Sequence, residues 1–143
     1  MMTLLSRINL VTLGVIDVAA ATEFYERLGW TKSTASNDQV AFFRSNGTVL
    51  GLFGREALAE DAQAGPVKDG FAGATFAQNF ESEKEIDEAF KHAIACGAKP
   101  MKQPQKVFWG GYSGYFSDPD GHVWELAHNP FTQLNFDGHK TLP

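Results

Sequence analysis

The hydrophobic positions of the chain follow the same order twice: an apolar run, an amphipathic stretch, and then several short runs between turns. Residues 8–15 are rich in β-branched and aliphatic types and predict a buried strand. Asp17 then offers an N-cap, apolar residues recur at helical spacing, and Gly29 stands where a C′ glycine ends a helix. Three strand-like runs follow, at 30–33, 40–44 and 48–53.

The second half repeats this order. Residues 72–78 predict a strand, and Ser82 with Glu85 forms a capping box at the start of a helix that Gly97 ends. Gly110 and its neighbour Gly111 predict a bend. Four further strand-like runs are 99–102, 107–109, 114–117 and 122–128.

The repeat predicts an α+β fold made of two paired βαβββ modules, whose curved mixed sheet surrounds a cleft. A lone module would leave one apolar face bare, and pairing two modules buries it. The repeat also makes Gly51 the counterpart of Glu125. The alternative is an unrelated α+β sandwich whose halves agree by chance. We expect a single domain, 1–143, organised as modules 7–54 and 71–130, a linker 55–70 with a short helix at 55–62, and a tail 131–143.

The composition of the chain restricts which classes of partner and which compartment the sequence predicts. The formal charge of −5 argues against nucleic acid, and the spaced lysines Lys99, Lys102 and Lys106 indicate a solvated loop. No apolar stretch is long enough for a membrane helix. The one cysteine, Cys96, forms no disulfide within the chain, which fits a reducing compartment and predicts a cytoplasmic protein.

Two motifs carry a family resemblance. Residues 115–126, Tyr-Phe-Ser-Asp-Pro-Asp-Gly-His-Val-Trp-Glu-Leu, resemble the closing signature of the vicinal oxygen chelate superfamily of glyoxalase, bleomycin-resistance and dioxygenase proteins. Residues 13–18 and 24–30 are similar to that superfamily's first strand and helix. The resemblance implies a glyoxalase-like fold with a U-shaped cavity, a homodimer, and, in many members, one divalent metal held by His and Glu or Gln.

Most metal-ligand positions implied by the resemblance carry no donor in this chain. They fall on Leu10, Gly51, near Gly73, and on Glu125, of which only the last has a ligand atom. We therefore predict no metal and no other cofactor. His122 and His128 lie at odd spacing from Glu125, so a strand sends them to the opposite face, unless a local bulge turns His128 inward. His92 is expected in solvent.

Without a metal, Glu125 is the predicted catalytic residue. A carboxylate in an aromatic cavity is expected to have a raised pKa and to serve as a general acid or base. Trp109, Tyr112, Tyr115 and Arg44 are the predicted substrate-binding residues. The alternatives are that Glu125 is a remnant satisfied by neighbours, that Arg44 holds it in an ion pair, and that the aromatic residues are ordinary strand packing.

Three functions are consistent with this sequence. The first is a metal-independent lyase or isomerase that uses Glu125 on a small-molecule substrate. The second is a non-catalytic small-molecule binding protein of the drug-resistance type, which the aromatic residues and the negative charge favour. The third is a metal-dependent lyase or dioxygenase whose ligands lie at other positions.

Overall fold

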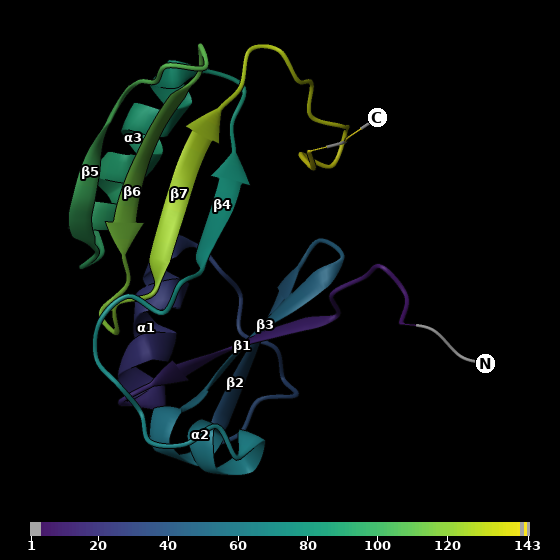
Figure 1. Cartoon of the computed structure of the whole chain (residues 1–143), viewed down its shortest axis with the longest axis vertical. Helices are drawn as coiled ribbons and strands as arrows, with labels where there is room; N and C mark the ends of the chain where they lie inside the picture. The colour runs from purple at the N-terminus through teal and green to yellow at the C-terminus, as the bar shows by residue number, and fades with distance from the viewer. Residues whose placement is uncertain (1–3, 141, 143) are drawn as a thin grey trace. The chain divides into compact units, whose positions relative to one another are not determined.

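The computed structural model describes residues 4–140 and 142, which form two compact units (Figure 1). One unit ends at Lys68 and the other begins at Asp69, inside the predicted linker. Each unit has its own β-sheet with a helix packed against one face. Across the described residues, no helix has the length and apolar character needed to cross a membrane.

The N-terminal unit contains a three-stranded sheet in the order β1-β3-β2. β1 pairs with β3 in parallel, and β2 pairs with β3 in antiparallel register. α2 directly follows β3 and approaches Gly14, where an added Cβ would lie 2.9 Å from the Arg55 Cβ. The elements are β1 (Leu10–Val15), α1 (Val18–Leu28), β2 (Val40–Ser45), β3 (Thr48–Gly54) and α2 (Arg55–Ala62).

Local signals set the ends of α1 as predicted. The Asp17 carboxylate accepts a hydrogen bond from the Ala20 amide at 3.1 Å, and Gly29 adopts the left-handed conformation with φ 117°. The helix packs on one face of the sheet, where Phe24, Tyr25 and Phe43 are completely buried. This aromatic cluster forms the core of the N-terminal unit.

The predicted strand at 30–33 is wrong. Only an isolated bridge joins Lys32 to Phe43, and the chain then turns. Side chains compete here for the backbone groups that a strand would use. The Ser36 hydroxyl accepts from the Phe42 amide at 2.9 Å, and the Asn37 carboxamide accepts from the Val40 amide at 3.1 Å. The first module therefore has one regular strand fewer than expected.

The C-terminal unit contains a four-stranded sheet in the order β4-β7-β6-β5, with α3 behind it in the view of Figure 1. β4 pairs with β7 in parallel, and the other pairs are antiparallel. The elements are β4 (Thr75–Asn79), α3 (Glu83–Ala95), β5 (Lys99–Lys106), β6 (Tyr112–Ser117) and β7 (Val123–His128).

Capping again explains where α3 begins and ends. The Ser82 hydroxyl accepts from the Glu85 amide at 3.2 Å, as a capping box requires. The Glu85 carboxylate accepts from the Glu81 amide at 2.8 Å, one residue before the cap. At the other end Cys96 is buried as the C-cap, and Gly97 has φ 110°. The buried face of the helix presents Ile86, Phe90 and Ala93.

Two predictions between α3 and β6 need correction. Residues 107–109 form a turn, not a strand, because the Gly110 amide donates to the Val107 carbonyl at 3.0 Å and Gly110 has φ 94°. The predicted strand at 99–102 is confirmed and extends to Lys106 as the edge strand β5, so the expectation of a solvated loop around the three lysines is wrong. Pro100 and Pro104 are tolerated there because an edge strand leaves some amide positions unpaired.

The α+β fold of two related modules is confirmed, with two open sheets. The register also agrees with the predicted repeat. Gly51 is opposite Phe42 in the first sheet, and Glu125 is opposite Tyr115 in the second. The pairing of the two modules around a common cleft stays a prediction.

Candidate functional site

The face of the C-terminal sheet that α3 does not cover is the candidate site, and we call it the open face. Side chains alternate between the two faces of a strand, so the register assigns each residue to a face. Phe116 and Trp124 belong to the helix-covered face with the core of this unit. The open face carries Thr75, Ala77, Asn79, Ser113, Tyr115, Ser117, Val123, Glu125 and Ala127.

Tyr115 and Glu125 form the only pair of ionisable side chains directly opposite each other on β6 and β7 of this face. Both side chains are half-buried. Burial raises the pKa of the Tyr115 phenol above its ordinary value, and the charge of Glu125 and a hydrogen bond to that carboxylate raise it further. The phenol therefore keeps its proton at neutral pH and donates to the carboxylate.

The turn before β7 holds Glu125 in this register. Asp118 is 2% exposed, and its carboxylate accepts from the Asp120 and His122 amides, each at 2.9 Å. Gly121 completes the turn with φ 90°. The Asp-Pro-Asp-Gly segment is thus the turn that connects β6 to β7. The carboxylate on the open face is that of Glu125, which lies on β7 after this turn.

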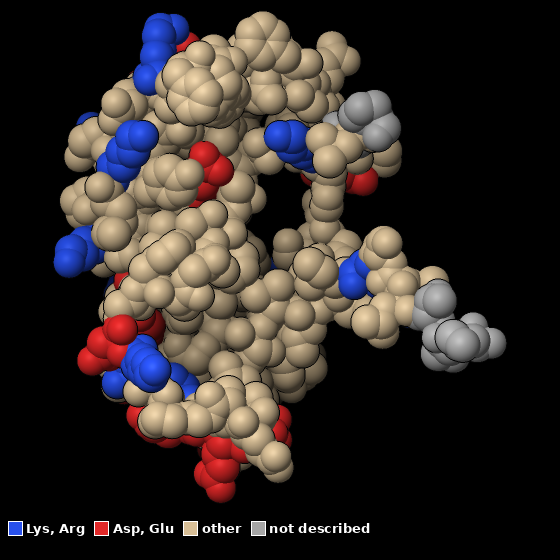
Figure 2. All heavy atoms as spheres, viewed as in Figure 1, with Lys and Arg blue, Asp and Glu red and all other residues tan. Residues whose placement is uncertain are grey.

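Small side chains surround the Tyr115–Glu125 pair. Ala77, opposite Glu125 on β4, is exposed, whereas Ser113 and Ala127, opposite each other beyond the pair, are buried. Figure 2 shows this side of the unit as mostly uncharged surface, with basic side chains spaced along the β5 edge. The half-buried phenol and carboxylate, beside the exposed Ala77, are therefore the part of this face that the polar groups of a ligand can meet.

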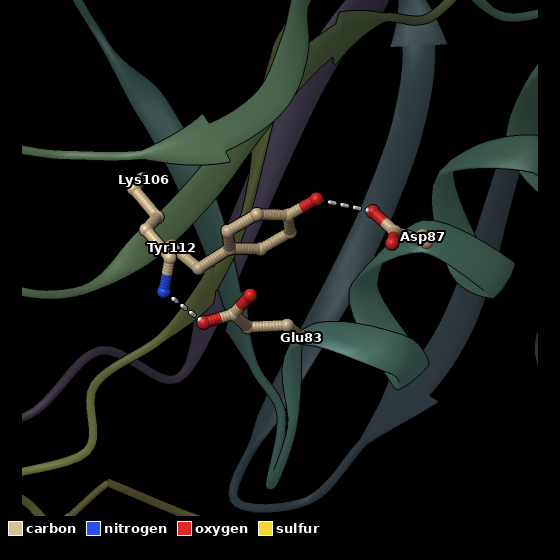
Figure 3. Close-up of polar contacts among 4 residues, drawn as sticks. All are labelled: Glu83, Asp87, Lys106 and Tyr112. Carbon is tan, nitrogen blue, oxygen red and sulfur yellow. Dashed lines mark hydrogen bonds and ion pairs between the residues drawn. The ribbon is translucent and has the colours of Figure 1, made fainter.

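Tyr112 belongs to the opposite face. It lies three residues before Tyr115, and its hydroxyl donates to the Asp87 carboxylate of α3 at 2.7 Å (Figure 3). This hydrogen bond is the main reason that the pKa of Tyr112 is raised from 10.0 to about 12. Lys106 lies on the same side and contacts Glu83 at 3.0 Å. These two contacts join the sheet to its helix, and the structure does not bring Tyr112 to Glu125.

Trp109 lies in the β5–β6 turn and not on a strand. Its ring lies over Gly111, where an added Cβ would overlap ring atoms. Gly110 similarly admits the Phe131 ring, which lies 2.9 Å from the position of an added Cβ. The indole is 40% exposed and is packed on its own turn.

Arg44 lies in the other unit, at the end of β2. It lines a hollow of about 320 Å³ together with Trp30, Thr31 and Asn46. A hollow of about 570 Å³ in the C-terminal unit lies between α3 and β5 and is lined by Phe90 among others. Glu125 lines neither of these hollows. Tyr115 is thus the one predicted substrate-binding residue that the structure pairs with Glu125.

The donor set does not fit a divalent metal at the positions that the resemblance implies. In the first sheet, an added Cβ on Gly51 would lie 3.4 Å from the side chains of Leu10, Phe42 and Thr12, so this position is enclosed by mostly apolar groups. In the second sheet, Gly73 precedes β4 and has φ 83°. Among the described residues, no three His, Cys, Asp or Glu side chains converge on one point.

The histidines do not complete a ligand set with Glu125. His128 is opposite Tyr112 and therefore on the helix-covered face, as predicted, where its Nδ1 lies 2.9 Å from the Phe80 carbonyl oxygen. The His92 ring is exposed, and its Nε2 lies 3.6 Å from the Cys96 Sγ, within one helix. We derive no step that uses a metal.

Sequence reasoning missed Lys102. The residue is opposite Tyr115 on β5, so the open face carries Lys102, Tyr115 and Glu125 on three adjacent strands. The register between β5 and β6 shifts on both sides of Lys102. Simple alternation along the sequence could not have assigned the face of Lys102, because each register shift adds one residue to β5 relative to β6.

Comparison with known proteins identifies a family and relatives that this chain resembles. The sequence pattern of the Glyoxalase/Bleomycin resistance protein/Dioxygenase superfamily matches residues 7–126. The metallothiol transferase FosB of Shouchella clausii is 25% identical over 137 residues, which cover 95% of this chain and 89% of that protein.

Solved structures agree with this match. A glyoxalase-related enzyme from Fulvimarina pelagi superposes with a TM-score of 0.87 at 32% identity, covering 96% of this chain and 99% of that one. A glyoxalase/bleomycin resistance protein/dioxygenase from Nocardioides gives 0.74 at 26% identity, covering 94% and 93%. Lactoylglutathione lyase from Agrobacterium tumefaciens gives 0.65 at 24% identity, covering 87% and 94%, and shares the fold.

Proposed function

The chain belongs to the Glyoxalase/Bleomycin resistance protein/Dioxygenase superfamily, and from this we propose that it is a metal-independent lyase or isomerase that moves a proton of a small carbonyl substrate. The observation that carries the proposal is the pairing of Glu125 with Tyr115 on the open face of the C-terminal sheet. The remaining ligand positions implied by the family lack donors, so the chemistry is assigned to these two side chains.

The proposed reaction begins with the Glu125 carboxylate, which takes a proton from a carbon next to the substrate carbonyl. The electron pair of the broken C–H bond moves into the carbonyl and leaves negative charge on its oxygen. Once protonated, Glu125 is a weaker hydrogen-bond acceptor, and the Tyr115 phenol turns to donate to that oxygen. Return of the proton to another atom gives an isomerase, and loss of a leaving group gives a lyase.

The Tyr115 phenol supports this role by its position, because a protonated phenol beside the carboxylate can donate a hydrogen bond to a developing oxyanion. The exposed Ala77 beside Glu125 supports access of the substrate to the pair from β4. FosB, a relative by sequence, carries metallothiol transferase in its name, but the donor set of this chain gives no basis for the metal part of that activity.

A test that needs no knowledge of the natural substrate is exchange of carbon-bound hydrogen for deuterium in D₂O, followed by proton NMR. Suitable probes are pyruvate, 4-oxopentanoate and the hemithioacetal of methylglyoxal and glutathione. We expect the protein to accelerate exchange of at least one probe, and Glu125→Gln to lower the rate by roughly 100-fold or more. Glu88→Gln, at an exposed carboxylate paired with Lys84 on α3, is the matched control.

The second candidate is a non-catalytic binding protein, which the small uncharged side chains beside the Tyr115–Glu125 pair favour. It predicts that no probe exchanges and that ligand affinity is the same in Glu125→Gln. The third candidate, a metal-dependent enzyme, predicts a stoichiometric divalent ion in protein purified without chelator. Either result contradicts the proposed acid–base function.

We also propose that the protein acts in the cytoplasm as a homodimer. β1 and β4 are edge strands, and exposed apolar side chains lie on or just before them: Ile8 is 67% exposed, Leu10 47% and Phe71 68%. Unprotected strand edges favour pairing with another strand. Light scattering after size-exclusion chromatography tests this, and a mass equal to one chain would contradict it.

A further inference from the structure

The open face has a cationic end that the proposed proton transfer does not use. β5 contains three lysines and no acidic residue, in a chain with a formal charge of −5. Lys106 contacts Glu83 on the helix-covered side. Lys99 and Lys102 are opposite Ser117 and Tyr115, so both belong to the open face, and neither makes an ion pair with any residue that the structure describes.

The backbone of β5 is arranged around Lys102. The register shifts between Pro100 and Lys102 and again between Lys102 and Gln105. β-Bulges of this kind redirect a side chain and are frequent beside functional sites. Gly114 makes the arrangement possible, because an added Cβ there would lie 3.0 Å from the Lys102 carbonyl oxygen and 2.9 Å from the Pro104 nitrogen. Lys102 is therefore held in register with Tyr115 by a local irregularity on each side.

Lys102, Tyr115 and Glu125 form a row across the sheet, on β5, β6 and β7. Neighbouring strands are about 4.8 Å apart, so the backbones at Lys102 and Glu125 are separated by about 10 Å, with Tyr115 between them. The carboxylate takes its hydrogen bond from the phenol and makes no ion pair with the lysine. The ammonium group of Lys102 is thus available to a ligand that also reaches the pair.

We infer that Lys102 is an anion-binding residue of this site, and that the ligand carries a carboxylate, phosphonate or phosphate group within about two strand spacings of the atom that Glu125 deprotonates. Such a ligand would be repelled by Glu125 alone, and the ammonium group offsets that repulsion. This inference rests on the proposed function for the reacting end of the ligand, whereas the anion contact is testable without turnover.

The test is a titration of the full-length protein with phenylphosphonate, benzoate and neutral benzyl alcohol, followed by amide chemical shifts. We expect saturable shifts at Lys102 and Tyr115 with both anions, and the comparison of the two identifies the preferred group. Lys102→Ala should weaken anion binding roughly fivefold, the range of an exposed ion pair, and leave benzyl alcohol unaffected. Lys106→Ala is the matched control, because that lysine faces α3, and it should leave the anion affinity unchanged.

Two results would overturn the inference: no saturable shift in the wild type, or equal losses in Lys102→Ala and Lys106→Ala. Glu125→Gln separates it from the proposed function. Removing that negative charge should maintain or strengthen anion binding. If anion binding still depends on Lys102 but no probe exchanges deuterium, the proposed proton transfer is wrong and the anion contact stands. If a probe exchanges deuterium but anion binding does not depend on Lys102, the anion contact is wrong and the proposed proton transfer stands.

Discussion

Gly51 of β3 and Glu125 of β7 occupy the same position in the two copies of the repeat, yet only Glu125 presents a side chain to its sheet face. Gly51 is buried, and an added Cβ there would already be in contact with three side chains, each at 3.4 Å. In the second module this position carries the Glu125 side chain, and the Tyr115 phenol lies beside it on β6. The two modules have therefore diverged in chemistry while keeping their register.

Gly51→Glu is expected to destabilise the protein and not to create a second acidic site. The new side chain has to displace Leu10, Phe42 or Thr12, and overpacking of this kind costs about 1–3 kcal/mol. Urea unfolding measures the loss. Adding Leu10→Ala removes one of the three obstacles and should recover part of the stability; a double variant no more stable than Gly51→Glu would contradict the packing explanation.

Gly114→Ala is expected to disturb β5. Its Cβ would meet backbone atoms of Pro104 and Lys102 at 2.9–3.0 Å, and backbone cannot move aside as a flexible side chain can. We expect a loss of about 1–3 kcal/mol and altered amide shifts along β5. Gly54→Ala is the control, because the nearest atom there is 3.9 Å away. Equal losses in the two variants would show that the close approach at Gly114 is not the cause.

Asp118→Ala is expected to lower stability by about 1–3 kcal/mol, because it leaves the Asp120 and His122 amides without their acceptor. Asp118→Asn keeps one carbonyl oxygen and should lose less. Thermal unfolding distinguishes the variants. If alanine and asparagine are equally destabilising, the acceptor role assigned to this buried side chain is incorrect.

The contact between Tyr112 and Asp87 predicts a pH dependence at alkaline pH. The pKa of Tyr112 is raised from 10.0 to about 12 in the folded chain, so the contribution of this pair is complete below pH 10 and is lost as the pH rises towards 12. Asp87→Ala removes the acceptor and with it the main cause of that shift. We expect the stability difference between wild type and Asp87→Ala to be largest below pH 10 and to shrink towards pH 12. A difference that stays constant over this range would contradict the linkage.

Much of the fold could be predicted from the sequence because its signals are local. The caps at Asp17 and Ser82 and the glycines Gly29 and Gly97 set the helix ends within a few residues. The predicted strand at 30–33 failed because Ser36 and Asn37 hydrogen-bond the backbone that a strand would have used, which only the folded turn reveals.

The candidate site was predictable where side chains alternate regularly. Tyr115 and Glu125 lie on regular strands, so alternation along the sequence assigns both to one face, while their roles in binding and catalysis stay predictions. Tyr112 lies three residues before Tyr115, and this odd spacing already indicates the opposite face, although both tyrosines were predicted to bind the substrate. Lys102 could not be found in this way, because the two register shifts of β5 depend on Gly114 and on the pairing itself.

The central claim is that Tyr115 and Glu125 act as one hydrogen-bonded unit on the open face, and a ¹³C-tyrosine NMR titration tests it most directly. Burial and Glu125 together raise the pKa of Tyr115. In Glu125→Gln the burial persists and the charge is gone, so we predict that the pKa of Tyr115 falls towards, but not to, the ordinary value of 10.0. A Tyr115 pKa that is the same in wild type and Glu125→Gln would contradict the account.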